Sequence, residues 1–417
     1  MHHIVFVTTE LAAKTRPSGG LASFTANMAQ ILAEKGYKVT VILVTSREEN
    51  VELGNGICVE NIYVRKSLWN FADKLSGMIP YRDKNYNEEL RRFWLFLYKA
   101  RKVRKKIDTI NKENRIDIVH YCSLGAFSIF HNKKLPYVVR ISSFLSMCKA
   151  ADKLEYKLEY KGNRLTIRER LEEYAIKKAE YVISPSELLA EIARRDIGIK
   201  ATVLESPFLL KQENWDSYSF NKIAKGKKYI IHYGTLGYLK GTYVVAQMVH
   251  TLLMENPDLT LVLIGKSKEI IDDCGNKIHI HELVQKNAGE YSDRVIYAGH
   301  LGREQLYPFI CNAELCLLPS RIENLSNACI EAMAMGKIVV ATYGASYEQL
   351  IDDRVSGFLC ERDNPESFLK AINEALGMSS VDKEKMVSKA MERIKLLSPE
   401  TVYEKYYDFY RKVIEEW

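Results

Sequence analysis

The stretch from Pro319 to Thr342 reads PSRIENLSNACIEAMAMGKIVVAT, and the rest of the chain is organised around it. A loop carrying Glu323 precedes a helix of small residues that carries Glu331. Gly336 is predicted to end this helix, because glycine tolerates the backbone conformation that closes a helix. The apolar run Ile338 to Ala341 then predicts a buried strand. The spacing therefore places two carboxylates near the entrance of one helix.

Ser326 is the predicted N-cap of this helix, because its hydroxyl can accept a backbone N–H that no helical carbonyl reaches. The amides of Asn327 and Ala328 then lie at the positive end of the helix dipole, which favours an anion such as a phosphate. Glu331 lies roughly 7 Å further along the axis, at about 1.5 Å per residue. A nucleotide fits this spacing, with its phosphate at the helix start and a sugar hydroxyl at the carboxylate.

The pair Glu323 and Glu331, with LLPS before it and EAMAMGKIVVAT after it, resembles the donor-site signature of retaining glycosyltransferases of family 4. Without these flanks, two glutamates eight positions apart would indicate only a solvated pair on a charged helix. The resemblance implies the GT-B fold, in which two Rossmann-like, doubly wound parallel-sheet α/β domains face each other across a cleft. It also implies that Glu323 holds hydroxyls of the donor sugar and that Glu331 holds the ribose.

The length of 417 residues favours two domains of ordinary size. A polar, aperiodic segment at 211–226 is the predicted hinge. We therefore expect an N-terminal acceptor-side domain over 1–208 and a C-terminal donor domain over 209–398. The resemblance implies that the aromatic-rich helix at 399–417 crosses back onto the first domain.

The N-terminus passes from Met1 directly into a short apolar run, without the pattern of a signal peptide. No stretch approaches the roughly 18 to 20 apolar residues of a membrane span. The eight cysteines are scattered and form no C-x-x-C pair, which is typical of buried reduced thiols. The sequence therefore predicts a cytoplasmic protein.

The net charge of +7 is mild, but it is concentrated in one segment. Residues 91–106 read RRFWLFLYKARKVRKK, with eight basic side chains, several aromatic ones and no acid. Such a segment suits peripheral contact with an anionic inner membrane face. The alternative is an ordinary helix that packs its aromatic face into its own domain and leaves its basic face solvated.

The first domain begins with a β-loop-α-β pattern: an apolar strand at 4–8, a helix until Gly36 and a strand at 38–44. The connecting loop carries Arg16 and the pair Gly19 and Gly20, where backbone could approach a phosphate. The pattern is not G-x-G-x-x-G, which disfavours a dinucleotide dehydrogenase. Together with Glu10 and Lys14, the Gly-Gly-Leu sequence resembles the opening of the glycogen and starch synthase branch of the same superfamily.

One departure from the family concerns the strand that contains His120. The family usually has a histidine two positions later, where it meets the donor sugar, and this chain has Cys122 there. Either His120 or a residue of the 140–149 loop takes over the contact, or the donor sugar differs. The alternative is that His120 has only a structural role in a buried strand.

The second domain restarts the pattern with YIIHYGTLGYLKGTYVV, a strand, a glycine-containing turn and a helix. In that turn Lys240 can reach a diphosphate as a point charge, close to Gly234. The family pattern G-R-L…K-G is matched except that Thr235 replaces the arginine. Arg16 or Arg140 from the first domain are the candidates to supply the missing charge.

With these residues, the resemblance implies a metal-independent retaining glycosyltransferase, with Glu323 and Lys240 as the catalytic pair and no cofactor. The expected donor is a nucleotide-diphosphate sugar, and the expected acceptor is a saccharide or lipid-linked glycan in cell-surface glycan synthesis. No D-x-D sequence, metal-ligand pattern or nucleic-acid-binding signature occurs. Two alternatives are a nucleotide-sugar epimerase of the same fold and an inactive nucleotide-sugar binder in which Thr235 and Cys122 mark lost catalysis.

Overall fold

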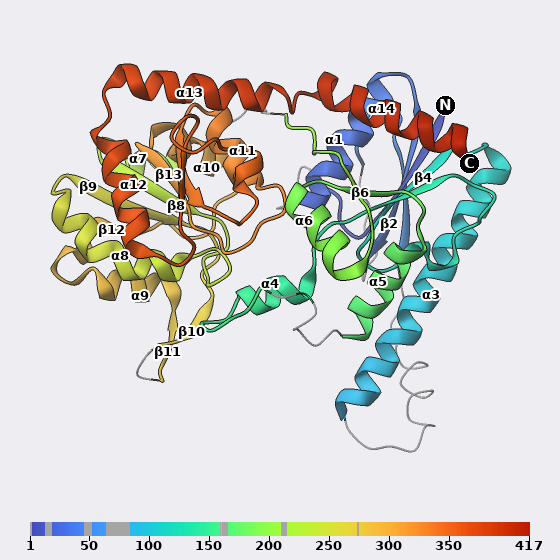
Figure 1. Cartoon of the computed structure of the whole chain (residues 1–417), viewed down its shortest axis with the longest axis horizontal. Coiled ribbons are helices and arrows are strands. Elements are labelled where there is room, and N and C mark those ends of the chain that lie inside the picture. Colours follow the sequence, from blue (N-terminus) through green and yellow to red (C-terminus); the bar gives the residue numbers. More distant parts are fainter. Residues whose placement is uncertain are drawn as a thin grey trace. The chain divides into compact units, whose positions relative to one another are not determined.

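The computed structural model describes residues 2–12, 19–45, 52–63, 84–158, 160, 166–209, 215–272 and 275–417, with the backbone alone for 84–88. The chain forms two compact units (Figure 1). Unit 1 comprises Met1–Met147, Glu159–Pro207 and Ser398–Trp417, and unit 2 comprises Cys148–Leu158 and Phe208–Leu397. The sequence places Cys148–Leu158 in the first domain, whereas the structure assigns this segment to unit 2.

Unit 1 contains a parallel sheet of seven strands in the order β3-β2-β1-β4-β5-β6-β7. Its strands are β1 His3–Thr8, β2 Lys38–Thr45, β3 Cys58–Tyr63, β4 Ile118–Cys122, β5 Tyr137–Arg140, β6 Val182–Ser184 and β7 Thr202–Val203. Its helices are α1 Gly20–Glu34, α3 Lys84–Glu113, the 3₁₀ turn η1 Phe127–Phe130, α5 Ile167–Lys178, α6 Glu187–Ile192, the π turn η2 Ala193–Ile197 and α14 Pro399–Glu416. The connection from β5 includes α4, Leu145–Ala151, within which unit 2 begins.

The last helix, α14, belongs to unit 1 although it follows unit 2 in the sequence. Val402, Tyr406, Tyr410 and Val413 recur at helical spacing and are completely or almost completely buried in the core of unit 1. The ring of Tyr406 lies 5.7 Å from that of Phe24 on α1. This aromatic stripe therefore fixes the C-terminal helix on the first sheet.

Unit 2 contains a parallel sheet of six strands in the order β12-β9-β8-β13-β14-β15. Its strands are β8 Lys228–Tyr233, β9 Leu259–Ile264, β12 Val295–Tyr297, β13 Leu315–Leu318, β14 Ile338–Thr342 and β15 Phe358–Cys360, with a separate hairpin of β10 Glu269–Ile271 and β11 Lys277–His279. Its helices and 3₁₀ turns are α7 Tyr218–Ile223, α8 Thr242–Glu255, α9 Ile280–Asn287, η3 Gly289–Arg294, α10 Arg303–Asn312, α11 Asn327–Ala334, η4 Tyr347–Gln349, α12 Pro365–Gly377 and α13 Ser380–Lys395.

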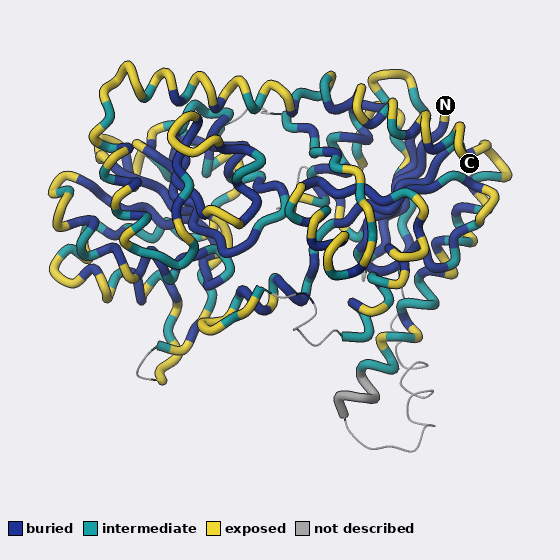
Figure 2. Tube along the Cα trace, in the orientation of Figure 1, coloured by how far each residue is buried: buried dark blue, intermediate teal, exposed yellow. Residues whose placement is uncertain are grey.

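Both units confirm the predicted fold class of two parallel-sheet α/β domains. In each unit the sheet is buried and the outward faces of the helices are exposed (Figure 2). Three elements lie where the sequence shows no regular pattern: β3 at 58–63, α4 inside the predicted long loop and α7 inside the predicted hinge. These elements are short or have mixed burial, so they leave little periodicity in the sequence.

Unit 1 contains the buried histidines His3, His120 and His131, and unit 2 contains His232. Both ring nitrogens of His131 and of His232 have hydrogen-bond partners in the neutral form. In unit 1, His131 Nε2 lies 2.8 Å from the Leu135 carbonyl oxygen, and His131 Nδ1 lies 2.8 Å from the Tyr121 hydroxyl. In unit 2, the ring nitrogens of His232 lie 3.0 Å from the Leu317 carbonyl oxygen and 2.9 Å from the Thr242 hydroxyl. Burial lowers the pKa of each ring to about 4.

Both units should therefore lose stability in acid. Between about pH 6.5 and 4 the unfolded chain binds protons at these rings and the folded chain does not, so the free energy of unfolding falls as the pH falls. Each ring contributes a slope of up to about 1.4 kcal/mol per pH unit. Urea unfolding of the wild type and of His232→Gln between pH 4 and 7 measures this slope. The expectation is wrong if the variant shows the same slope as the wild type.

Candidate donor site

The site in unit 2 lies at the carboxyl ends of β8 and β13. These strands are neighbours, and the strand order reverses between them, with β9 and β12 on one side and β14 and β15 on the other. In open parallel sheets, ligands bind in the crevice at such a reversal. The loops 234–241 and 319–326 follow the two strands, and together with α11, which follows the second loop, they carry the predicted donor-site residues of the second half of the chain.

The two loops touch each other closely. The backbone N–H of Arg321 donates to the carbonyl oxygen of Leu239 over 2.9 Å. Gly241, the N-cap of α8, has φ +70° and lies so close to Pro319 that a Cβ added there would lie 1.8 Å from the Pro319 carbonyl oxygen. The glycine therefore permits both the left-handed conformation and the close approach of the second loop.

The close contact between the two loops brings the predicted catalytic residues together. The Lys240 ammonium and a carboxylate oxygen of Glu323 form an ion pair. The side chains are 29% and 13% exposed, so the pair is partly accessible from solvent. The backbone N–H of Glu323 also donates to the Ala345 carbonyl oxygen over 3.0 Å, which ties the loop to the segment after β14.

The helix that follows, α11, begins as the sequence predicts. Ser326 is its N-cap, and the Ser326 hydroxyl accepts the backbone N–H of Cys329 over 3.4 Å. Asn327 and Ala328 form the first turn and are half-buried. The Ala328 carbonyl oxygen accepts the Tyr233 hydroxyl over 2.6 Å, which joins this turn to the end of β8. The helix ends before Gly336, which has φ +67°.

Glu331 is buried between α11 and α10. Its carboxylate lies 3.2 Å from Nε of Arg303 and 3.3 Å from the Tyr307 hydroxyl. Burial raises the pKa of Glu331, and the charge of Arg303 acts in the opposite direction. The carboxylate is thus held in a fixed position one turn inside the helix.

Two family models match the chain. The model described as Glycosyltransferase Family 4 matches residues 18–205, and the model described as Glycosyl transferases group 1 matches residues 227–377. Lipopolysaccharide 1,2-N-acetylglucosaminetransferase of Salmonella typhimurium is 27% identical over 37% of this chain and 40% of its own length. An uncharacterized glycosyltransferase of Haemophilus influenzae is 24% identical over 89% of this chain and 92% of its own. The chain thus spans less than half of the Salmonella relative.

Solved structures share the architecture. Sucrose-phosphate synthase from Thermosynechococcus elongatus gives a TM-score of 0.73 at 17% identity, with 100% of both chains covered. Anabaena HepE, solved in complex with UDP, gives a TM-score of 0.64 at 15% identity, with 99% and 100% covered. The chain thus matches a glycosyltransferase family model in each of its units and has the GT-B fold of these solved structures. In the described part of the chain, no helix is both long and apolar enough to cross a membrane.

The predicted donor-site residues in the loop between β1 and α1 lie only partly within the described residues. Arg16 lies outside the described residues. Gly19 is the N-cap of α1 and has no side chain that could cap the helix. Gly19 and Gly20 are both exposed. The carboxylate of Glu10 lies next to Gly19, 3.3 Å from the position that a Cβ would take. A phosphate contact by these two glycines stays a prediction.

His120 and Arg140 have partners inside unit 1, and a donor contact by either of them stays a prediction. His120 is 2% exposed, and its Nδ1 lies 2.6 Å from the Tyr410 hydroxyl. Burial, helped by the charge of Arg140, holds the pKa of His120 well below its usual value. Arg140 is 3% exposed, donates to Ser206 over 2.9 Å and lies over the Phe24 ring at 3.9 Å. Both side chains are enclosed by α1 and α14, so we leave them out of the donor site proposed below.

Cys122 is also internal. Its thiol is buried, lies 3.3 Å from the Leu124 carbonyl oxygen and has a pKa raised by burial to about 12. Thr235, by contrast, is exposed in the loop after β8, as is Gly234. The replacement at 122 therefore changes a buried position, whereas the replacement at 235 changes an exposed position of the donor loop.

Sequence reasoning missed two groups that hold the donor loops. The His232 ring binds the Thr242 hydroxyl, and that hydroxyl accepts the backbone N–H of Gly237 over 3.0 Å. A histidine inside the apolar run YIIHY was the available signal for this network. The second group joins Arg321 to Cys148–Leu158, and the large separation in sequence left no signal for it.

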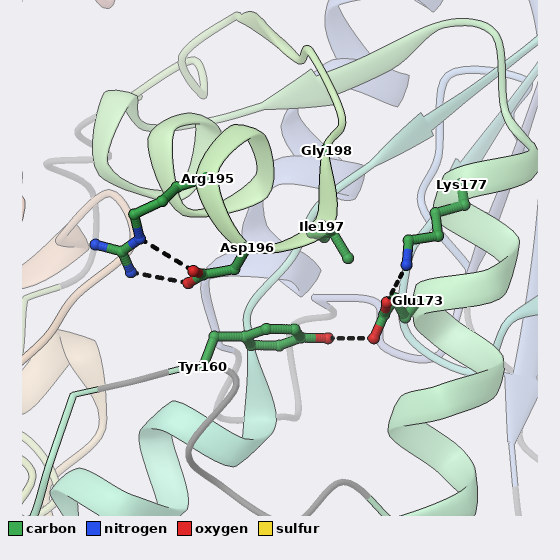
Figure 3. A pocket seen from close by; sticks show the side chains of 7 residues that line it. All are labelled: Tyr160, Glu173, Lys177, Arg195, Asp196, Ile197 and Gly198. Carbon is green, nitrogen blue, oxygen red and sulfur yellow. Dashed lines mark hydrogen bonds and ion pairs between the residues drawn. The ribbon is translucent and has the colours of Figure 1, made fainter.

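A cavity of about 510 Å³ lies in unit 1 and is separate from these loops. It is lined by Tyr160, Glu173, Lys177, Arg195, Asp196, Ile197 and Gly198. Figure 3 shows that its polar groups face one another: the Tyr160 hydroxyl and Lys177 both bind Glu173, and Arg195 binds Asp196. The charges in this cavity are therefore already paired within the protein.

Proposed function

We propose that the chain is a retaining glycosyltransferase of family 4 that binds the diphosphate of a nucleotide-sugar donor at Lys240 and the start of α11. The Lys240–Glu323 pair at the strand reversal of unit 2 is the observation that supports this proposal most directly. A cation and a carboxylate held side by side suit a donor that carries an anionic diphosphate and a hydroxyl-rich sugar. The match to the group 1 model covers the same loops.

In the proposed reaction, the bond between the anomeric carbon of the donor sugar and the diphosphate oxygen breaks. Negative charge develops on that oxygen, and Lys240 and the first amides of α11 stabilise it without a metal ion. The acceptor hydroxyl forms the new bond on the same face of the sugar. Its proton passes to the departing phosphate oxygen, so that charge and atoms balance. Glu323 holds hydroxyls of the sugar during this transfer.

The position of Glu331 supports a contact with the ribose of the nucleotide. Its carboxylate is fixed by Arg303 and Tyr307 and lies one turn beyond the helix start. An ionised carboxylate accepts hydroxyl hydrogen bonds, and an amide in its place accepts them more weakly. This contact would add affinity for any ribonucleotide, whichever base it carries.

A thermal-shift series with UDP, GDP and ADP tests the proposed site. A nucleotide that binds the folded chain at 100 times its Kd stabilises it by about 2.7 kcal/mol, so one of the three should raise the melting temperature clearly. Glu331→Gln should weaken binding of that nucleotide about tenfold, as expected for one hydrogen bond to a charged group. The site is wrong if none of the three shifts the wild type.

We infer that the acceptor is a saccharide or a lipid-linked glycan in cell-surface polysaccharide biosynthesis. The Salmonella relative, a lipopolysaccharide 1,2-N-acetylglucosaminetransferase, supports this class of acceptor, and UDP in the HepE complex makes UDP-sugars the first donors to test. An epimerase would convert a donor without any acceptor. Product analysis with donor alone separates the two reactions.

The surface of α3 supports a peripheral contact with an anionic membrane. Leu95, Val103 and Ile107 are buried, so one face of the helix packs into unit 1 as an amphipathic helix should. The opposite face exposes Trp94 together with Arg101, Lys102 and Lys105. The helix is 30 residues long, and Figure 1 shows its N-terminal turns extending past the sheet of unit 1.

Vesicle flotation measures this contact. Binding should be strong with vesicles containing phosphatidylglycerol and weak with phosphatidylcholine alone, because each basic residue near such a surface contributes about 1 kcal/mol. Changing Arg101, Lys102 and Lys105 to glutamine should lower the partition coefficient about 100-fold. A control with Lys383, Lys385 and Lys389 changed to glutamine removes the same charge from α13. Equal losses in both variants would argue against a specific surface on α3.

A further inference from the structure

Residues 148–158 form a strap that leaves unit 1 within α4 and packs in unit 2. Its contacts are made with the loops of the candidate donor site and with the segments beside them. The strap therefore brings a piece of the chain from between β5 and α5 to the residues next to Lys240 and Glu323.

Asp152 of the strap binds the first donor loop. One of its carboxylate oxygens accepts the backbone N–H of Leu239 over 3.3 Å. The other oxygen forms an ion pair with the ammonium of Lys268, which lies beyond β9. Leu239 directly precedes Lys240, so the Asp152 carboxylate holds the backbone from which the catalytic lysine extends.

Arg321 binds the strap from the second donor loop. It is 3% exposed, and its Nη1 donates to the carbonyl oxygens of Ala151, over 3.1 Å, and of Lys153. Its Nε donates to Asp363 over 2.9 Å, and its guanidinium lies 4.1 Å from the centre of the Tyr156 ring. The Tyr156 hydroxyl also donates to Asp363. The strap is thus bound to the second donor loop at Arg321, two residues before Glu323.

Three consecutive strap residues therefore connect the two loops that carry the catalytic pair. We propose that Asp152 and Arg321 are positioning residues, through which the strap sets the separation and orientation of Lys240 and Glu323. This proposal rests on the donor site proposed above. Neither residue touches the donor; each acts through the backbone next to a residue that does. A displacement of about 1 Å at a reacting group can lower a rate by about 100-fold.

Cys148 supplies a measurement of strap docking that does not depend on activity. Its thiol is half-buried on the strap, and its pKa is raised by burial, with a contribution from the charge of Glu323, to about 11. The buried, protonated thiol should react slowly with N-ethylmaleimide while the strap is docked. Peptide mapping by mass spectrometry separates it from Cys58, which is exposed.

The test compares Asp152→Ala, Lys268→Met, Arg321→Lys and the control Arg354→Lys. Asp152→Ala loses both the ion pair and the Leu239 contact, whereas Lys268→Met loses only the ion pair. Arg321→Lys keeps the charge, but one ammonium cannot reach Ala151, Lys153 and Asp363 at once. Arg354 forms an exposed pair with Glu374 in the same unit and has no contact with the strap in the described structure.

The probe is whichever of UDP, GDP and ADP gives the largest thermal shift with the wild type. We expect Asp152→Ala and Arg321→Lys to raise its Kd at least tenfold and to speed Cys148 modification, with a small change in melting temperature. Lys268→Met should have a smaller effect, and Arg354→Lys should behave as the wild type.

The outcomes separate the two proposals. If none of the three nucleotides binds the wild type, the donor site is wrong and the positioning role is overturned with it. If one binds the wild type, and Asp152→Ala and Arg321→Lys speed Cys148 modification while leaving the Kd unchanged, only the positioning role is overturned. A Kd that rises in Asp152→Ala but not in Arg354→Lys supports it.

Discussion

Lys240→Ala should lower turnover of the nucleotide-sugar donor by about 10²- to 10³-fold, the usual cost of removing a group that stabilises a developing oxyanion. In the structure Lys240 is a partly buried cation next to the strand reversal, in an ion pair with Glu323. Glu323→Ala should cause a loss of similar size, because it removes the proposed contact with the donor sugar and leaves the lysine without its partner. Lys240→Arg keeps the charge and should retain part of the rate.

The measurement is release of nucleoside diphosphate from the donor, with and without EDTA. Wild-type turnover should persist in EDTA if Lys240 and α11 stabilise the leaving group without a metal ion. Lys389→Ala is the matched control, since Lys389 also pairs with a glutamate in unit 2 but on the exposed face of α13. An unchanged rate in both Lys240→Ala and Glu323→Ala would rule out the proposed catalytic pair.

Gly241→Ala should destabilise unit 2 by more than about 3 kcal/mol, among the large effects of a single substitution. The backbone at Gly241 has φ +70°, which costs roughly 1–2 kcal/mol for a residue with a Cβ. The added Cβ would also lie 1.8 Å from the Pro319 carbonyl oxygen and 2.5 Å from the carbonyl carbon. The loop that carries Glu323 must therefore move, and donor affinity should fall with stability.

Urea unfolding and nucleotide titration of Gly241→Ala measure the two effects. Gly226→Ala is the control, because Gly226 has φ +78° and no atom within 4 Å of an added Cβ. An alanine at position 226 has a similarly strained backbone, but its Cβ meets no second loop. If the two variants lose equal stability, the close approach of the donor loops contributes nothing, and our account of how they are held is wrong.

The local structure around the donor helix could be predicted from neighbouring residues. Ser326 caps α11, and Gly336 follows its end with positive φ, because both effects depend on residues within one helical turn. The apolar runs that became β8, β9, β13 and β14 predicted a parallel sheet for the same reason. The resemblance implied that the aromatic-rich helix at 399–417 crosses back onto the first domain, and α14 does pack in the core of unit 1.

The partners of polar side chains could not be predicted in the same way. His120 and Arg140 are residue types that often bind ligands, but in unit 1 they contact Tyr410 and Ser206. Glu331 was expected to face a nucleotide, and its neighbours Arg303 and Tyr307 come from a different helix. Such contacts depend on where two elements meet, and nothing in either local sequence fixes that.

The sequence by itself determined most strands and helices of two parallel α/β units, though not β3, α4 and α7, and the positions of Glu323, Lys240 and Glu331 relative to them. The reason is that periodicity, caps and turns act over short distances. Only the tertiary structure decided that Lys240 and Glu323 form an ion pair, and that Asp152 and Arg321 fasten a distant strap beside it. The reason is physical: hydrogen bonds and ion pairs are selected by three-dimensional proximity, and the strap is separated from the loops it binds by 87 to 170 residues.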